Sequence, residues 1–372
     1  METEFEIFLA APPGLEEVLR DEAAAAGFAH PVAVPGGVTL RGGWPEVWRA
    51  NLQLRGAGRV LARLGAFRAM HLAQLDKRAR KFPWGETLRP DLPVHVEVTC
   101  RKSRIYHARA ASQRIERAIA EELGAPVVSD PAEAEVRIKA RIEDDLCTLS
   151  IDSSGEPLHK RGHKEAVGKA PMRETLASLF LRQCGYSGTE PVLDPMCGSG
   201  TFVIEAAEIA AGLQPGRSRA FAFEKLASFD AAAWDRLRGA TAAVTPECRF
   251  HGFDRDAGAI RMSQANAERA GVAAFTTFRC QPVSELQRPE GPPGLVMVNP
   301  PYGARIGNKK LLFSVYGALG KVLLERFSGW RVGLVTSEAG LARATALPFR
   351  PPGPPVAHGG LRITLFQTDP LP

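Results

Sequence analysis

Residues 191–201 read Pro-Val-Leu-Asp-Pro-Met-Cys-Gly-Ser-Gly-Thr, a short apolar strand followed by a loop of small residues. A helix-like apolar segment, residues 202–211, comes directly after the loop. Gly198 and Gly200 allow the backbone to turn tightly and to approach a ligand closely. A strand, a glycine loop and a helix in this order indicate an open α/β sheet that binds its ligand at the carboxyl ends of parallel strands.

The residues of this loop narrow the kind of ligand. No Gly-Lys-Ser/Thr follows, which argues against a nucleotide phosphate loop, and the third glycine of the dinucleotide fingerprint is missing. Asp194, at the end of the strand, is placed to bind an ammonium or hydroxyl group. An acid at the loop without a lysine suits a cationic, phosphate-free cofactor, and S-adenosylmethionine is such a molecule.

A second strand, residues 248–254, ends in Asp254, which we expect to hold a ribose diol. The alternative is a helix-capping aspartate, a task that Asp256 could equally perform. Residues 212–245 lie between the two strands and contain Phe221, Phe223, Phe229 and Trp234. We expect them to form an insertion packed on the sheet.

A third segment that could take part in binding or catalysis is Asn-Pro-Pro-Tyr at 299–302, which follows the apolar run Gly-Leu-Val-Met-Val. Two prolines fix φ and remove two backbone donors, so the carbonyl oxygens of Asn299 and Pro300 can face a ligand. The ring of Tyr302 can stack on a flat base. The segment predicts a pocket for a nucleobase amine, and its alternative is a proline-rich strand exit with a capping asparagine.

Together, Asp-Pro-Met-Cys-Gly-Ser-Gly-Thr and Asn-Pro-Pro-Tyr-Gly resemble the motifs of the class I amino-methyltransferases. Residues 158–163, Leu-His-Lys-Arg-Gly-His, and 170–177, Ala-Pro-Met-Arg-Glu-Thr-Leu-Ala, narrow the resemblance to the THUMP-domain RNA guanine methyltransferases. These enzymes methylate the 2-amino group of guanine, and the chain most resembles the bacterial branch that acts on 23S ribosomal RNA. The resemblance implies a Rossmann-like α/β methyltransferase domain preceded by an α+β ferredoxin-like and THUMP RNA-binding region.

The resemblance also implies which residues form the site. Those for the target base are Asn299, Pro300, Pro301 and Tyr302. Those for the cofactor S-adenosyl-L-methionine, with Ala170 beside them at the helix entrance, are Pro171, Glu174, Thr175, Asp194, Met196, Gly198, Gly200, Thr201, Asp254, Gln281 and Asn299. The chain departs from the family at Gln281, which stands where an aspartate usually contacts the adenine amine.

Charge is distributed unevenly along the chain. Residues 1–40 carry one Lys or Arg against seven Asp and Glu, whereas residues 41–110 carry 15 against 5. So basic a region predicts contacts with RNA phosphates, although each cluster could instead be a solvated helix face. The residues that we assign to RNA are Arg78, Lys81, Arg101, Lys102, Arg104, Lys160, Arg161 and Arg305. For Tyr106 and His107 we favour helix capping and packing over base contact.

At 372 residues the chain is long enough for several domains. Alternating strand and helix patterns predict a ferredoxin-like domain over 1–55, a THUMP domain over 56–165 and a methyltransferase domain over 166–372. A proline-rich segment, 348–355, precedes a final strand at 361–367, and we expect this segment near the active-site face.

The six cysteines show no spacing typical of a zinc site or a disulfide framework, so we expect reduced thiols, no metal and a cytoplasmic protein. The first residues are acidic, and no uninterrupted apolar segment of about 18 residues occurs, so we expect no membrane partner. Three other functions stay open: a transfer RNA guanine-N2 methyltransferase, an adenine-N6 DNA methyltransferase and a non-catalytic RNA-binding assembly protein. The basic N-terminal half argues against the DNA enzyme, and the intact Asn-Pro-Pro-Tyr argues against the assembly protein.

Overall fold

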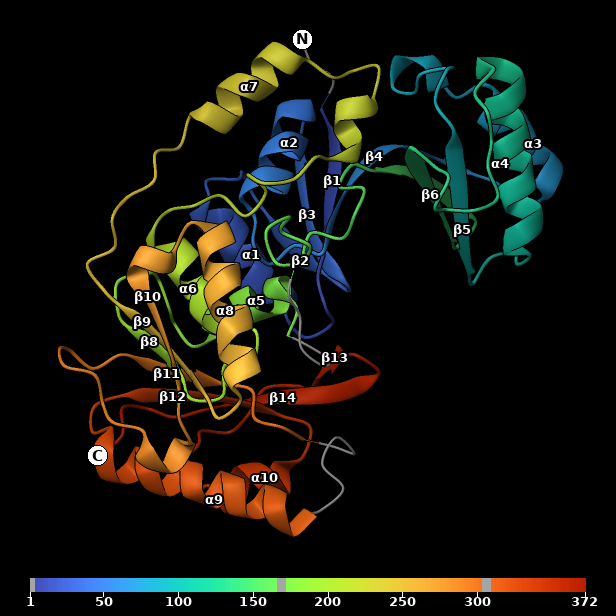
Figure 1. Cartoon of the computed structure of the whole chain (residues 1–372). Helices are drawn as coiled ribbons and strands as arrows, with labels where there is room; N and C mark the ends of the chain where they lie inside the picture. The colour runs from blue at the N-terminus through green and yellow to red at the C-terminus, as the bar shows by residue number, and fades with distance from the viewer. Residues whose placement is uncertain (1–3, 166–171, 303–308) are drawn as a thin grey trace. The chain divides into compact units, whose positions relative to one another are not determined.

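The computed structural model describes residues 4–165, 172–302 and 309–372. The chain divides into two compact units (Figure 1). The N-terminal unit comprises residues up to 11, 20–158 and 219–240, and the C-terminal unit comprises residues 12–19, 159–218 and 241–372.

The N-terminal unit is built on one seven-stranded sheet with the order β2-β3-β1-β4-β7-β6-β5. Its strands are β1 (Phe5–Ala10), β2 (Val32–Val34), β3 (Gly37–Gly42), β4 (Arg59–Arg68), β5 (Val94–Arg101), β6 (Val136–Glu143) and β7 (Leu146–Asp152). Strand β4 pairs with β1 along its first half and with β7 along most of its length, with a register shift between Arg63 and Gly65. The ferredoxin-like and THUMP parts therefore share a strand, and the boundary that we placed at 55/56 stays a prediction.

The helices of this unit include α2 (Trp44–Gln53), α3 (Leu72–Arg80) and α4 (Ala108–Leu123), with a 3₁₀ turn η1 (Trp84–Glu86). Helix α1 (Glu16–Ala25) belongs to it from Arg20 onward. Helix α4 buries Ala111, Ile115 and Ala118, one face of a 3.6-residue repeat. It ends at Gly124, whose φ of 81° is the left-handed conformation that favours glycine. The expected α+β pattern is confirmed, and only the short strand β2 was missed.

The insertion after α6 was placed wrongly. Its 3₁₀ turn η2 (Ala222–Lys225) and helix α7 (Ala231–Gly239) belong to the N-terminal unit, not to the methyltransferase sheet. The ring of Phe223 stacks on Trp48 of α2, with centroids 6.0 Å apart, and Phe229 contacts the same indole edge-on at 5.8 Å. Both rings pack on Trp48 of α2, a partner that the periodicity of the sequence does not reveal.

The C-terminal unit has a second seven-stranded sheet with the order β10-β9-β8-β11-β12-β14-β13. Its strands are β8 (Val192–Asp194), β9 (Phe250–Asp254), β10 (Thr276–Cys280), β11 (Leu295–Val298), β12 (Arg331–Thr336), β13 (Val356–His358) and β14 (Leu361–Gln367). Strands β8 to β12 run parallel, and β14 is antiparallel to β12. All four residues of β11 are buried, as in a parallel strand covered on both faces.

Helices cover both faces of this sheet. Figure 1 shows α5 (Glu174–Gln183), α6 (Thr201–Ala210) and α8 (Ala257–Ala270) on one face, and α9 (Lys309–Arg326) and α10 (Ala339–Ala344) on the other. Two further 3₁₀ turns are η3 (Ala273–Phe275) and η4 (Val283–Glu285). This three-layer arrangement is the Rossmann-like fold that the sequence predicted.

The proline-rich segment crosses from one edge of the sheet to the other. It begins near the amino-terminal end of β12, because Phe349 bridges Thr368 and the Thr368 N–H donates to the carbonyl of Val332. It ends at β13, whose Val356 pairs with Ile363, the neighbour of Thr364 opposite Thr336 at the carboxyl end of β12. Its end therefore lies at the edge where α/β folds bind ligands, and its beginning does not. Among the helices described, none is both long and apolar enough to cross a membrane.

Candidate active site

The order of the strands reverses between β8 and β11, and α/β folds bind their ligands at the carboxyl ends of strands at such a point. Asp194 is the last residue of β8, and Asn299 follows the last residue of β11. The fold thus carries the two segments singled out in the sequence to neighbouring positions on one edge of the sheet.

The glycine loop after β8 adopts the tight turn that its sequence predicts. Gly198 has a φ of 54° and Gly200 a φ of 83°, both in the left-handed region. A Cβ atom added to Gly198 would meet nothing within 4 Å, so this backbone has an open face. Helix α8 holds the loop from the other side, since Ser263 Oγ donates to the Gly198 carbonyl at 2.8 Å and Asn266 Nδ2 to the Ser199 carbonyl at 3.1 Å.

Asp194 is a buried acid, with 2% of its surface exposed. Its Oδ1 accepts a hydrogen bond from the Met196 N–H at 2.9 Å. Burial raises the pKa of this carboxyl well above its ordinary value, and the nearby charge of Asp254 adds to the increase. A cationic ligand would stabilise the ionised form of such a buried carboxyl.

Asp254 and Asp256 have different roles, which the sequence left open between helix capping and ligand binding. Asp256 caps α8, because its Oδ1 accepts from the Gly258 N–H at 2.7 Å. Asp254 instead accepts from the Gly198 N–H at 3.0 Å, which ties the end of β9 to the glycine loop. Gln281 lies beside it, since its N–H donates to the Asp254 carbonyl at 3.0 Å.

A lysine that the sequence reasoning missed lies beside the glycine loop. Lys164 Nζ lies 2.7 Å from Glu174 Oε1 and donates to Thr201 Oγ1 at 2.8 Å. About 9% of the lysine side chain and 10% of the glutamate side chain are exposed. The ammonium thus joins the start of α5, where Thr175 is also buried, to the start of α6. Its position one residue after the Leu-His-Lys-Arg-Gly-His motif was the available signal.

The segment 299–302 presents an acceptor without a partner. Asn299 Oδ1 is buried and accepts no hydrogen bond from any residue that the structure describes. The Pro301 carbonyl accepts from Tyr316 OH of α9 at 3.3 Å, which fixes the loop against that helix. A buried amide oxygen without a donor is costly in a folded protein, and a ligand N–H could supply the missing donor.

The structure differs from the prediction at Tyr302. Its side chain is 1% exposed, so the ring is buried and cannot stack on a base in this conformation. It lies close enough to Tyr316 for the two phenols to influence one another electrostatically, and burial is the main cause of a raised Tyr316 pKa. The ring therefore supports the segment from within the unit.

The assignment of Arg161 to RNA was wrong. Its guanidinium Nη2 lies 3.0 Å from Glu205 Oε1 of α6, and both side chains are at most 2% exposed. Two residues on, His163 Nε2 lies 3.2 Å from Glu208 Oε1, and burial lowers the pKa of this histidine. These two pairs fix the segment against α6, while Lys160, the residue before Arg161, is exposed.

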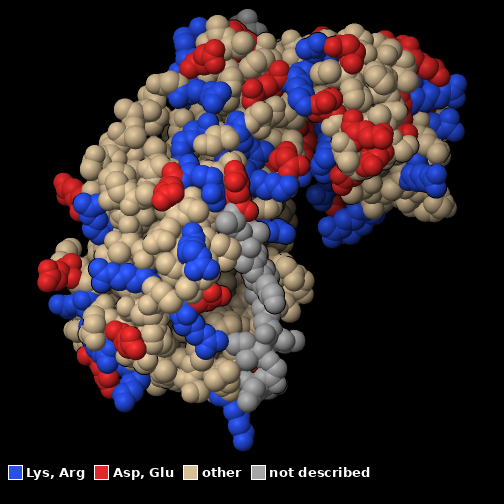
Figure 2. All heavy atoms as spheres, in the orientation of Figure 1, with Lys and Arg blue, Asp and Glu red and all other residues tan. Residues whose placement is uncertain are grey.

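The other predicted RNA contacts fall into two groups at opposite ends of a helix pair. Arg101, Lys102 and Arg104 are exposed between the end of β5 and the start of α4, where Arg104 Nε lies 3.7 Å from Asp145. Arg78 and Lys81 are exposed at the end of α3, next to Arg80, which pairs with Glu121 and Glu122 near the end of α4. Figure 2 shows basic and acidic side chains interspersed over this part of the chain.

Three predicted site residues, Ala170, Pro171 and Arg305, lie outside the described residues. Within 4–165, 172–302 and 309–372, no group of three or more His, Cys, Asp or Glu side chains is arranged to hold a metal ion.

The sheet order and the acid-bearing glycine loop define a class I methyltransferase fold. The chain belongs to the RMKL-like methyltransferase family, whose domain model matches residues 161–347. An RlmL ferredoxin-like domain model matches residues 6–61, and a THUMP domain model matches residues 69–152.

Individual relatives agree with this family. The chain is 33% identical over 337 residues to the ribosomal RNA large subunit methyltransferase K/L of Aliivibrio salmonicida, covering 87% of this chain and 48% of that protein. The chain thus spans about half the length of this curated relative. A predicted N6-adenine-specific DNA methylase from Listeria monocytogenes is 28% identical, with a TM-score of 0.88 and coverage of 98% of this chain and 96% of that one. A possible methylase from Clostridium difficile 630 is 26% identical, with a TM-score of 0.87 over 100% and 99%.

Proposed function

We propose that the chain transfers a methyl group from S-adenosylmethionine to the 2-amino group of a guanine in structured RNA, most specifically in 23S ribosomal RNA. The observation that carries this proposal is the buried, unpartnered Oδ1 of Asn299, at the sheet edge that also holds Asp194. A base amine would supply the missing donor. The similarity to the large subunit methyltransferase K/L supports ribosomal RNA as the substrate class.

The residues on the β8 side fit the cofactor. S-adenosylmethionine supplies, when bound, a methyl group activated by a sulfonium. The buried carboxyl of Asp194 would bind its ammonium, and Asp254, whose Oδ2 already takes one N–H, has further lone pairs for a ribose hydroxyl. The open face of Gly198 allows close approach of the cofactor to the backbone.

In the proposed reaction, the guanine nitrogen forms a bond to the methyl carbon as the carbon–sulfur bond breaks. The nitrogen becomes positive, so an acceptor at Asn299 Oδ1 stabilises the transition state more than the ground state. Asn299 is a neutral amide and cannot take the proton, but the methylated ammonium is acidic enough to lose it to water. Holding the two reactants in line supplies most of the remaining acceleration.

The test is to incubate the protein with radiolabelled S-adenosylmethionine and separate pools of ribosomal RNA, transfer RNA and DNA, followed by nucleoside analysis. Label in N2-methylguanosine from the 23S fraction is the expected result. Label in transfer RNA alone would show that transfer RNA, and not ribosomal RNA, is the substrate. Label only in 6-methyladenine would show that the target base is adenine and not guanine. We also propose the three-domain division at 55/56 and 165/166 and an action in the cytoplasm.

A further inference from the structure

Phe313, in the first turns of α9, exposes 45% of its surface. The buried residues Leu312, Tyr316 and Leu319 form the stripe of α9 that faces the unit, and Phe313 lies off this stripe. A single exposed apolar residue is ordinary on a protein surface. Its neighbours decide whether it has a role.

Hydrogen bonds hold the start of α9 and the start of α10 at the catalytic edge. Tyr316 OH, one turn after Phe313, donates to the Pro301 carbonyl at 3.3 Å and lies 3.2 Å from Thr336 Oγ1 at the end of β12. Thr336 Oγ1 also accepts from the N–H of Glu338, the residue that precedes α10, at 3.3 Å. The surface between these two helix starts therefore has a fixed position relative to Asn299.

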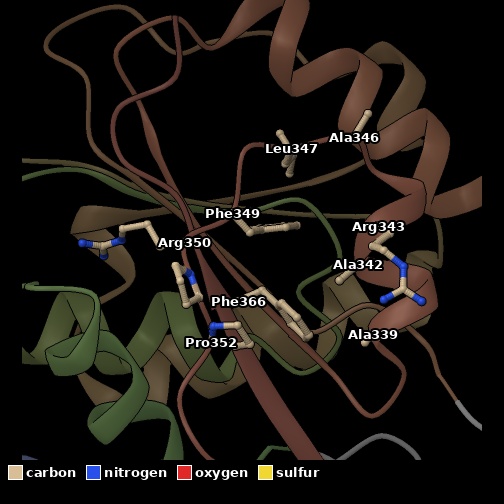
Figure 3. Close-up of a pocket in the computed structure, with 10 residues that line it drawn as sticks. Ala339, Ala342, Arg343, Ala346, Leu347, Phe349, Arg350, Pro352 and Phe366 are labelled. Atoms are coloured by element: carbon tan, nitrogen blue, oxygen red, sulfur yellow. The ribbon is translucent and has the colours of Figure 1, made fainter.

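Gly340 of α10 lies beneath that surface. A Cβ atom added to it would stand 3.9 Å from Phe313 Cζ and 3.9 Å from Arg343 Nη2, so an aromatic ring and a guanidinium flank the same bare backbone. Arg343 is exposed and also stands at the edge of a pocket of about 600 Å³. Figure 3 shows it with Ala339 on one side of this pocket, across from Phe349 and Phe366.

We propose that Phe313, Gly340 and Arg343 bind an unpaired nucleotide of the RNA substrate that neighbours the target guanine. The proposal rests on the proposed function and deepens it. The base would stack on the exposed Phe313 ring, and the guanidinium of Arg343, on the other side of Gly340, would pair with the phosphate. The buried Tyr302 offers no exposed ring for this purpose, whereas Phe313 does. Splaying a guanine out of a stack exposes its neighbour, so a second stacking surface offsets part of that cost.

The test compares Phe313→Ala, Phe313→Trp and Arg343→Gln with two controls at the other edge of the sheet, Val244→Ala and Arg182→Gln. Val244 is 57% exposed and Arg182 is exposed near the end of α5. Two quantities are measured on the full chain. One is the single-turnover methylation rate of deproteinised 23S ribosomal RNA, and the other is the anisotropy-derived affinity for a labelled single-stranded decaribonucleotide and for its duplex.

Stacking is worth about 1–3 kcal/mol per base, so Phe313→Ala should weaken single-strand binding and slow methylation by about 5- to 100-fold. Duplex binding should change little, because its bases are paired, and Phe313→Trp should retain the wild-type values. Arg343→Gln should weaken binding of both RNAs and reduce its salt dependence. The control variants should match the wild type, and affinity for S-adenosylhomocysteine, measured by calorimetry without RNA, should be unchanged throughout.

Wild-type single-strand affinity and methylation rate in Phe313→Ala would overturn the proposal. So would a loss of cofactor affinity or of thermal stability in that variant, because Phe313 would then support the fold. If the wild-type chain methylates no RNA, the proposed function fails, while the single-strand and duplex affinities still decide whether Phe313 stacks on a base.

Discussion

Lys164 Nζ donates a hydrogen bond to Thr201 Oγ1 over 2.8 Å, while it pairs with Glu174. This one ammonium ties the segment before α5 to the first residue of α6, immediately beside the glycine loop. It also neutralises a carboxylate that has little access to water.

Lys164→Met should therefore weaken cofactor binding by about 10- to 100-fold, since hydrogen bonds to charged groups contribute about 1.5–3 kcal/mol. The variant leaves the Glu174 carboxylate without its ammonium. Titration calorimetry with S-adenosylhomocysteine measures the effect. Lys164→Arg should recover part of it, and Lys160→Met, an exposed lysine in the same segment, should bind the cofactor normally. Unchanged affinity in Lys164→Met would remove this lysine from the site.

The raised pKa of Asp194 predicts that the affinity for the cofactor depends on pH. Its raised pKa means that the free protein keeps this proton to a higher pH than an ordinary aspartate, and a cationic cofactor favours the ionised form. Affinity should thus rise with pH through the raised pKa and level off above it, as calorimetry over a series of pH values above the ordinary aspartate pKa would show.

The raised pKa of Asp194 also affects stability: cofactor affinity should rise with pH, whereas the free energy of unfolding should fall. Between the ordinary aspartate pKa and the raised one, the folded chain holds a proton that the unfolded chain releases, so unfolding becomes easier as pH rises. Asp194→Asn should flatten both pH profiles and weaken cofactor binding at every pH. If its affinity follows the wild-type pH profile, Asp194 is not the group that titrates.

Asn299→Ala should separate chemistry from binding. The lost acceptor acts most strongly as positive charge develops on the target amine, so the single-turnover rate should fall by about 10²- to 10³-fold, with smaller changes in cofactor and RNA affinity. Gln287→Ala removes an exposed amide before β11 and serves as the control. Near wild-type methylation by a folded, cofactor-binding Asn299→Ala would refute the amine pocket.

The buried ring of Tyr302 predicts an effect on stability rather than on stacking. Tyr302→Ala should lower the free energy of unfolding of the C-terminal unit by about 3–5 kcal/mol, as in other buried aromatic truncations. Tyr302→Phe keeps the ring and should retain most of the methylation rate. Thermal unfolding followed by circular dichroism distinguishes the two. A Tyr302→Ala variant as stable as the wild type would show that the ring is not part of the core.

The basic group at the start of α4 predicts salt-dependent RNA binding. Replacing Arg101, Lys102 and Arg104 together by Gln should reduce the slope of log affinity against log salt by about 0.7 for each phosphate contact that is lost. The full chain is the right material, because residues 1–165 alone lack the rings that cover Trp48. Arg182→Gln is the control. An unchanged slope in the triple variant would place RNA binding elsewhere.

The sequence alone determined the Rossmann-like domain, the position of its glycine loop and of its Asn-Pro-Pro-Tyr segment, and the α+β region before it. Each of these is encoded locally: Asp194 and Gly198 lie within five residues of one another, and Asn299 directly follows its own apolar strand. Local patterns survive folding because apolar period, glycine conformation and missing proline donors act over a few residues.

Only the tertiary structure decided what each polar or aromatic group meets. Arg161 and Lys164 stand three residues apart in one basic run, yet one is buried against Glu205 and the other lies beside the glycine loop. The insertion rings pack on Trp48, about 175 positions earlier in the chain, and Tyr302 is buried while Phe313 is exposed. Such partners are brought together by packing between distant segments, and a side chain's burial depends on those partners rather than on its neighbours in sequence.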